Sequence, residues 1–287
     1  MAARTERELR ADIVEVCSKI YANGWVAAND GNVSVMIDDN HAICTPTGIS
    51  KGCITTDMLI KVDMDGNMVE GEKELKPSSE IKMHLDILKN KPGVTSVVHA
   101  HPPYSTAYAV AGIPLDQCIL PEIVISLGQI PLTRYGTPST FEIPDNVREH
   151  LKDNFVFLLE NHGALSTGEN VFQAYYRMES MELFAKIDAI AHSLGNVNTI
   201  SEGNVKKLLK LRTDWGMDTQ NFSGCRVGDK LINYSNADNG ANSGNNSKNT
   251  VADYNLLQDN DKITLTRKEL QEIIESTVKN ILKEMNG

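Results

Sequence analysis

The chain has 287 residues, of which 41% are hydrophobic, and a formal net charge of −10. This length fits one large domain or two, and the acidic pI near 5.2 argues against nucleic-acid binding, which requires a basic surface. The sequence contains no run of about eighteen apolar residues, and its polar start lacks the apolar region of a secretory signal. We therefore expect a soluble, cytoplasmic protein.

The hydrophobic pattern of the first part of the chain changes between the periods of helices and strands. It predicts, in order, a helix at residues 5–22, strand hairpins at 32–45 and 59–67, a helix that ends before Pro92, and a strand at 94–101. Pro102 ends that strand, because proline cannot donate to a strand ladder.

The second part continues with longer helices. It predicts, in order, a helix at residues 104–111, mixed signals at 113–131, a loop at 134–139, a buried strand at 155–159 and helices at 170–194 and 205–212. These elements lack the regular strand–helix alternation of a doubly wound fold. We therefore expect an α/β domain of the α+β type, with an antiparallel or mixed sheet flanked by helices.

The composition changes after about Gly216. Residues 233–249 are almost entirely polar, and such a segment cannot bury enough apolar surface to offset its ordering entropy. Beyond it, Thr266 and Glu269 have capping-box spacing, and apolar residues recur at helical spacing as far as Met285. We expect a folded domain at residues 1–216, a flexible linker at 217–261 and an amphipathic helix at 262–287. The helix either packs on its own domain, pairs with itself or binds a partner in a groove, and the long linker favours the partner.

The cysteine pattern favours reduced thiols. Five cysteines are present, an odd number, and no two of them form a Cys-x-x-Cys pair. This is typical of small buried side chains in a reducing compartment rather than of a disulfide framework. We therefore expect free thiols at Cys17, Cys44, Cys53, Cys118 and Cys225.

Three histidines lie where predicted strands end. His99 and His101 are two residues apart on one strand, so their side chains point to the same face. His162 follows a second buried strand, in a loop of the kind that builds sites. Three neutral imidazoles with an open fourth position are typical of catalytic zinc. The sequence therefore predicts a divalent metal at these three residues and assigns no role to His41, His84, His150 or His192.

Glu80 has two interpretations. It follows Ser78 and Ser79 at the start of a predicted helix. In the first interpretation a serine caps the helix and Glu80 is a favourable first-turn carboxylate. In the second, the serines and the helix amides hold a phosphate, and Glu80 is a base beside the metal. Turns at residues 29–32 and 45–48 suit phosphate binding too, but they are equally typical of ordinary turns.

Together, five motifs in this order resemble the class II aldolase/adducin-domain family. They are Gly31-Asn32-Val33-Ser34, Thr45-Pro46-Thr47-Gly48, Pro77-Ser78-Ser79-Glu80, Val98-His99-Ala100-His101 and Asn161-His162-Gly163. The resemblance extends over about residues 5–215. It implies a single domain with a central, largely antiparallel sheet, assembled as a homotetramer with sites at subunit interfaces.

The resemblance also implies the chemistry. One zinc ion per subunit would be bound by the three histidines, and Glu80 would be the acid/base residue and a fourth ligand when no substrate is bound. The residues implied in phosphate binding are Asn32, Thr47, Gly48, Ser78 and Ser79. The expected reaction cleaves a ketose 1-phosphate, L-fuculose 1-phosphate or L-rhamnulose 1-phosphate, to dihydroxyacetone phosphate and lactaldehyde. Zinc would stabilise the ene-diolate as a Lewis acid.

The sequence departs from such aldolases in two places. The C-terminal tyrosine expected near the end of the domain is not evident, and Trp215 is nearby. The tyrosine that protonates the departing aldehyde oxygen has no equivalent at residues 117–122, where Glu122 is one substitute and Tyr135, further along, is another. L-ribulose-5-phosphate 4-epimerases and methylthioribulose-phosphate dehydratases share the motifs. The epimerases carry Asp at the position of Glu80, which favours the aldolase. A non-catalytic adducin-like scaffold would be expected to lose the metal ligands, which are all present here.

The C-terminal tail resembles the peptides that direct enzymes into bacterial microcompartments. This implies that residues 262–287 bind a shell protein or a co-packaged enzyme, and that the protein resides in the microcompartment lumen. Such confinement would retain lactaldehyde, which is reactive and diffusible.

Overall fold

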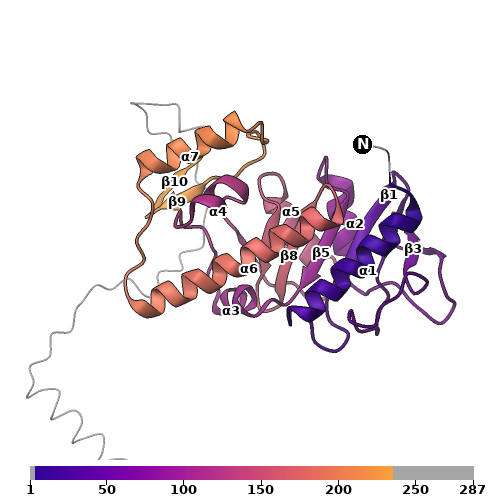
Figure 1. Ribbon diagram of the computed structural model, residues 1–287. Helices are drawn as coiled ribbons and strands as arrows, with labels where there is room; N and C mark the ends of the chain where they lie inside the picture. Colours follow the sequence, from indigo (N-terminus) through magenta and orange to yellow (C-terminus); the bar gives the residue numbers. More distant parts are fainter. Residues whose placement is uncertain (1–3, 235–287) are drawn as a thin grey trace, which may run out of the picture. The chain divides into compact units, whose positions relative to one another are not determined.

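The computed structural model describes residues 4–234, so the linker beyond residue 234 and the helix expected at 262–287 lie outside the described part of the chain. The helices are α1 (Glu6–Ala22), α2 (Ile81–Asn90), α3 (Pro103–Ala111), α4 (Pro121–Ser126), α5 (Glu142–Leu151), α6 (Val171–Leu194) and α7 (Glu202–Asp214) (Figure 1). Over this described range, no helix is long and apolar enough to cross a membrane.

The strands fall into one large sheet and one hairpin. They are β1 (Asn32–Asp38), β2 (His41–Cys44), β3 (Ile60–Asp63), β4 (Met68–Glu70), β5 (Ser96–Ala100), β6 (Leu132–Thr133), β7 (Val156–Leu159), β8 (Gly163–Gly168), β9 (Cys225–Val227) and β10 (Lys230–Ile232). The large sheet has the order β4-β3-β2-β1-β5-β8-β7-β6. All its neighbouring strands are antiparallel except β6 and β7, which are parallel. The expectation of an α/β domain with a largely antiparallel sheet is confirmed.

Helices cover both faces of this sheet. α1, α3 and α6 pack on one face, against a core that includes Val33, Val35 and Val98. α2 and α5 pack on the other face, against Val62 and Phe157 among others. Successive strand residues point to opposite faces, and this double cover explains why every residue of β5 and β8 is buried.

Several elements differ from the expectation. β8 is built of small and polar residues, so its sequence carries no apolar run, and it is a strand because it pairs with β5 and β7. α5 begins at the irregular loop and carries Pro144 in its first turn, where proline is tolerated. β9 and β10 lie where the linker was expected to begin. These three-residue strands are held by tertiary packing, since Cys225 and Ile232 join a small core with α4 and α7.

Cys118 and Cys225 form a disulfide, so the expectation of five free thiols is wrong for this pair. The two residues are 107 apart in the sequence, and their Cα atoms are 5.4 Å apart. Neither the spacing of the cysteines in the sequence nor the amino-acid composition predicts that the fold brings these two residues together. Cys17, Cys44 and Cys53 are free, and burial raises the pKa of the Cys17 and Cys44 thiols to about 12.

Candidate active site

The three histidines predicted to bind metal meet at one edge of the sheet. His99 lies in β5, His101 follows that strand, and His162 lies in the turn between β7 and β8. β5 pairs with β8, with Ala100 opposite Ala164, so the turn before β8 lies beside the end of β5. One ligand atom from each histidine lies within 4.8 Å of the others.

Two motif glycines permit this close approach. A Cβ atom on Gly163 would lie 2.4 Å from Cδ2 of His101, and one on Gly31 would lie 2.9 Å from the carbonyl oxygen of His99. Gly31 also has a φ of +71°, which L-residues with side chains rarely adopt. The two glycines therefore make room for the histidine cluster.

Glu80 contacts two of the three histidines. Its Oε1 lies 3.1 Å from Nε2 of His162, and its Oε2 lies 3.4 Å from Nε2 of His99. Asn32, which pairs with His99 across β1 and β5, donates its Nδ2–H to Oε2 of Glu80 at 2.8 Å. Glu80 occupies the N-cap position of α2, where the helix dipole favours a carboxylate.

The protonation states of this cluster suit a divalent cation. Burial lowers the pKa of His99 to about 3, although Glu80 opposes this shift. Its Nδ1–H donates to the Ala164 carbonyl at 2.9 Å, which leaves Nε2 as the free acceptor. Burial lowers the pKa of His101 as well. For Glu80 burial acts to raise the pKa, but His99, His162 and Asn32 outweigh it, and the pKa lies well below its usual range. Neutral imidazoles and a carboxylate are the forms that bind metal.

Four atoms at this point are buried with no hydrogen-bond partner among residues 4–234. They are His99 Nε2, His101 Nε2, His162 Nδ1 and Glu80 Oε1. A buried polar atom without a partner costs about 1–3 kcal/mol, and a bound divalent cation would satisfy several of them at once. Imidazole nitrogens with a carboxylate oxygen are a donor set that zinc and neighbouring transition ions accept. The residues therefore fit a metal.

Asp30 is a further carboxylate beside the cluster that sequence reasoning did not single out. Its Oδ2 lies 3.6 Å from Nδ1 of His101. A carboxylate behind a ligand imidazole orients the ring and fixes its tautomer. The sequence feature that could have indicated Asp30 is its position between Asn29 and Gly31, in the turn already considered for phosphate binding.

The turns predicted to bind phosphate lie side by side. Pro46 forms an isolated bridge with Pro77, and the Thr47 N–H donates to the Lys76 carbonyl at 2.9 Å. These contacts place Thr47 and Gly48, both exposed, next to the exposed Ser79.

The other two predicted phosphate ligands are already engaged. Asn32 is buried, with its amide on Glu80, and the Ser78 hydroxyl accepts from the Glu80 N–H at 3.3 Å. Glu80 is itself the N-cap residue of α2, and no side chain caps this helix. The structure therefore differs from the first interpretation, in which a serine caps the helix and Glu80 lies in its first turn. The Glu80 carboxylate faces the histidines, as the second interpretation required.

Tyr135 and Glu122 make no hydrogen bond or ion pair with the histidine cluster in the described part of the chain. The Tyr135 side chain is 54% exposed, and its backbone N–H donates to Glu160 at 2.7 Å. Glu122 lies in the first turn of α4. In the same segment Cys118 is in the disulfide and Asp116 pairs with Arg226 at 3.1 Å.

Sequence reasoning missed two buried polar side chains near the site. His84, assigned no role as a solvated helix residue, is fully buried, and its Nδ1 lies 2.9 Å from Oγ of Ser34. Its position on the apolar stripe of α2 was the available signal. Lys51 is also buried, and its Nζ donates to the carbonyls of Asn29 and Ile49 at 3.1 and 2.9 Å, which ties the two candidate phosphate turns together.

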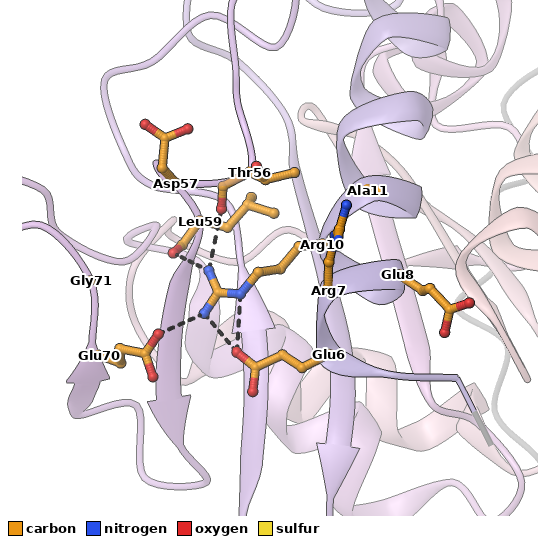
Figure 2. Close-up of a pocket in the computed structure, with 10 residues that line it drawn as sticks. All are labelled: Glu6, Arg7, Glu8, Arg10, Ala11, Thr56, Asp57, Leu59, Glu70 and Gly71. Atoms are coloured by element: carbon orange, nitrogen blue, oxygen red, sulfur yellow. Dashed lines mark hydrogen bonds and ion pairs between the residues drawn. The ribbon is translucent and has the colours of Figure 1, made fainter.

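A separate open cleft of about 730 Å³ lies between the start of α1 and residues 56–71 (Figure 2). At its centre Arg10 bonds to Glu6, to Glu70 and to the carbonyls of Thr56 and Leu59. These five hydrogen bonds use all the donors of a guanidinium group, so Arg10 has none left for a ligand. None of the lining residues is a histidine or cysteine, and the histidine cluster remains the candidate active site.

Comparisons with known proteins agree with the fold. The Class II Aldolase and Adducin N-terminal domain matches residues 11–189. A 3-oxo-tetronate 4-phosphate decarboxylase of Escherichia coli O6:H1 is 33% identical over 189 residues, which cover 64% of this chain and 88% of the relative. An L-fuculose phosphate aldolase of Methanococcus maripaludis is 32% identical over 183 residues, which cover 64% and 97%.

The crystal structure of YgbL from Escherichia coli has a TM-score of 0.66 to this chain at 30% identity, and the match covers 71% of this chain and 99% of YgbL. The chain therefore belongs to the class II aldolase and adducin family, and it is an enzyme of the class II aldolase type.

Proposed function

We propose that this enzyme is a zinc-dependent aldolase that cleaves L-fuculose 1-phosphate or L-rhamnulose 1-phosphate to dihydroxyacetone phosphate and lactaldehyde. The observation that carries the proposal is the convergence of His99, His101 and His162 with the Glu80 carboxylate at one edge of the sheet. The relative named L-fuculose phosphate aldolase supports the substrate class.

Different residues of this chain bind the metal ion and the phosphate in this proposal. A bound zinc ion supplies Lewis-acid stabilisation of the negative charge that develops on the substrate carbonyl oxygen. The three histidines hold the ion. Thr47, Gly48 and Ser79 are exposed at the point where the turn at residues 45–48 meets the segment at residues 76–79. They are free to contact the phosphate.

Glu80 moves the proton. When the bond between C3 and C4 of the ketose breaks, its electron pair stays on C3 and the C4 hydroxyl loses its proton to give the aldehyde. C3 then takes up a proton and dihydroxyacetone phosphate is complete. Glu80 is the ionised carboxylate beside the ion, and Asn32 fixes its position. Lys51 does not act as a Schiff base here, because its Nζ is occupied by two carbonyl oxygens.

A second candidate is decarboxylation of 3-oxo-tetronate 4-phosphate, the reaction named for the Escherichia coli relative. Loss of carbon dioxide from that acid also leaves dihydroxyacetone phosphate, after the same build-up of charge beside the carbonyl. Its leaving group needs no proton transfer at an aldehyde oxygen. The observation that favours this candidate is the segment at residues 113–122, which contains no tyrosine and whose Cys118 is in a disulfide.

The experiment that tests these proposals measures release of dihydroxyacetone phosphate from all three compounds. One sample is assayed as purified, after chelation, and after zinc is restored. Release from a ketose 1-phosphate that is lost and regained supports the aldolase. Release from the keto acid alone replaces it with the decarboxylase. No release from any of the three by zinc-loaded protein rejects both reactions and favours the epimerase or dehydratase.

We also propose that the enzyme is a homotetramer. α6 supports self-association because it presents an apolar stripe to solvent at helical spacing. The residues of this stripe, each between 45% and 84% exposed, are Tyr176, Leu183, Ile190 and Leu194. An exposed apolar stripe of this kind is typical of a protein–protein interface.

For residues 262–287 we propose binding to a microcompartment shell protein or a co-packaged enzyme, which would place the enzyme in the microcompartment lumen. The apolar periodicity of that segment supports a helix-in-groove contact. Deleting the segment is expected to abolish co-fractionation with shell proteins while activity persists. Unchanged co-fractionation would reject this partner.

A further inference from the structure

Two pairs of polar side chains join β1 to α2. Asn32 donates to Glu80 at 2.8 Å, and two residues further along the strand Oγ of Ser34 lies 2.9 Å from Nδ1 of His84. Two strand residues span about 6.6 Å and four helix residues about 6 Å. Because these spacings match, the two pairs are consecutive polar contacts between the strand and the helix.

We propose that Ser34 and His84 are a positioning pair, which fixes the position and rotation of α2 along β1 and so keeps the Glu80 carboxylate directed at the three histidines. His84 bonds to Ser34, and its Nε2 has no partner in the described part of the chain. Its effect on the site is therefore transmitted through the position of Glu80.

α2 packs on the sheet mainly through apolar side chains, and its ion pairs, Lys89 with Asp65 and Asp86 with Arg148, go to the β3–β4 turn and to α5. Ile81, Leu85 and Leu88 pack into the core beneath the helix. Hydrophobic packing is non-directional, so it tolerates small shifts and rotations of a helix. A buried hydrogen bond is directional and costly to lose. The pair of Ser34 and His84 therefore supplies the direction that apolar packing lacks, one helical turn from Glu80.

The state of His84 suits a positioning role. Burial lowers its pKa to about 4, against an opposing influence of Glu80, so the ring is neutral near pH 7. A proton on Nδ1 lets the ring donate to the Ser34 hydroxyl and leaves Nε2 as a bare acceptor. That arrangement avoids an unpaired N–H in the core, which would be the costlier state.

The test uses the full-length protein loaded with Co²⁺, whose visible absorption reports its ligand set. His84→Leu and Ser34→Ala are each expected to lower Co²⁺ affinity about 10-fold, the lower end of the loss seen when a supporting residue is removed. Their spectra should shift in the same direction as that of Glu80→Gln. His84→Asn keeps a donor near the Nδ1 position and should restore affinity to within about 2-fold.

Ser96→Ala is the matched control. Ser96 is also a buried hydroxyl of the sheet, but it pairs with Val35 and so lies on the face opposite α2. Its substitution should leave Co²⁺ affinity unchanged. If His84→Leu fails to fold, Ser34→Ala provides the same readout.

The proposal fails if Ser34→Ala and His84→Leu bind Co²⁺ like the wild type. It also fails if Glu80→Gln changes neither affinity nor spectrum, since Glu80 would then not be held at the ion. A double variant that combines Ser34→Ala with His84→Leu and loses affinity by the product of the two single fold-changes would reject it as well, because members of one pair should not act independently. The inference rests on the proposed function only for the role of Glu80. Co²⁺ binding needs no substrate, so a failure to cleave any sugar phosphate would leave it standing.

Discussion

Asn32 and Glu80 are 48 residues apart in the sequence, and a hydrogen bond of 2.8 Å joins their side chains. It links the strand beside His99 to the helix that begins at Glu80. The bond is partly buried and its acceptor is charged, and hydrogen bonds to charged groups are the strong class of side-chain hydrogen bond. Asn32 was predicted as a phosphate ligand, and the structure shows its amide bonded to the carboxylate that faces the histidines.

Asn32→Ala tests which of the two roles matters. A hydrogen bond to a charged group contributes about 1.5–3 kcal/mol, so we expect kcat to fall about 10–100-fold with little change in KM. Steady-state kinetics, with whichever compound the release assay identifies as the substrate, measures both constants. An equally large rise in KM at unchanged kcat would instead support the phosphate role. Asn40→Ala, in the exposed turn between β1 and β2, is the control and should change neither constant.

The histidine cluster could be predicted from the sequence because its signals are local. His99 and His101 share a strand face by the period of two, and His162 follows a second apolar strand. The fold class followed from the same periodicities. β8 could not be predicted, because Gly163 to Gly168 are a strand only through pairing with β5 and β7.

Contacts between residues that are distant in the sequence account for the other features that could not be predicted. His84 contacts Ser34, which lies 50 positions earlier, and helical spacing alone does not separate a solvated histidine from one that faces a strand. The disulfide of Cys118 and Cys225 joins residues 107 apart. Cysteine counting cannot reveal a pair that only the packing of β9 near α4 brings together.

His162→Ala tests the metal centre. We expect metal affinity to fall by more than the 10–100-fold that loss of a supporting residue costs, because a ligand itself is removed. Metal content after dialysis against a weak chelator, compared with wild type, measures this. His192→Ala, at the exposed end of α6, is the control and should retain metal. Equal metal content in the two variants would contradict the assignment of His162.

Loss of the disulfide should destabilise the region around α4 and α7. In the chain-entropy model a loop of about 100 residues is worth about 4.7 kcal/mol, although measured values are typically about 2–4 kcal/mol. We expect Cys225→Ser to lower the free energy of unfolding by about 2–4 kcal/mol, measured by denaturant titration without reductant. The exposed Cys53, changed to Ser, should have no such effect. The same midpoint for wild type and Cys225→Ser would contradict the prediction.

The apolar stripe of α6 provides a test of self-association. Leu183 lies in its middle and is 57% exposed, so Leu183→Glu would place a charge in any interface formed there. We expect the sedimentation coefficient to shift from that of a tetramer toward that of a monomer at unchanged helix content. Leu211→Glu, on the exposed surface of α7 at 40%, is the control. A tetramer that persists in Leu183→Glu would place the interface elsewhere, and a monomeric wild type would reject self-association.

His84 predicts a pH dependence of stability. Its pKa is about 4 in the folded protein against an ordinary value of 6.5. Below pH 6.5 the unfolded chain binds a proton at this residue and the folded chain does not, so stability falls as the pH drops from 6.5 toward 4. At 1.36 kcal/mol for each pKa unit, the contribution lost is about 3 kcal/mol.

The measurement is the free energy of unfolding of metal-free protein at several pH values. In wild type His99, with a pKa of about 3, contributes in the same direction, so the whole slope cannot be assigned to His84. In His84→Asn we expect the slope between about pH 6 and 5 to decrease by about one proton. His192→Asn, at an exposed position, is the matched control. A wild-type slope in His84→Asn would mean that the folded protein takes up a proton at His84 as readily as the unfolded chain does.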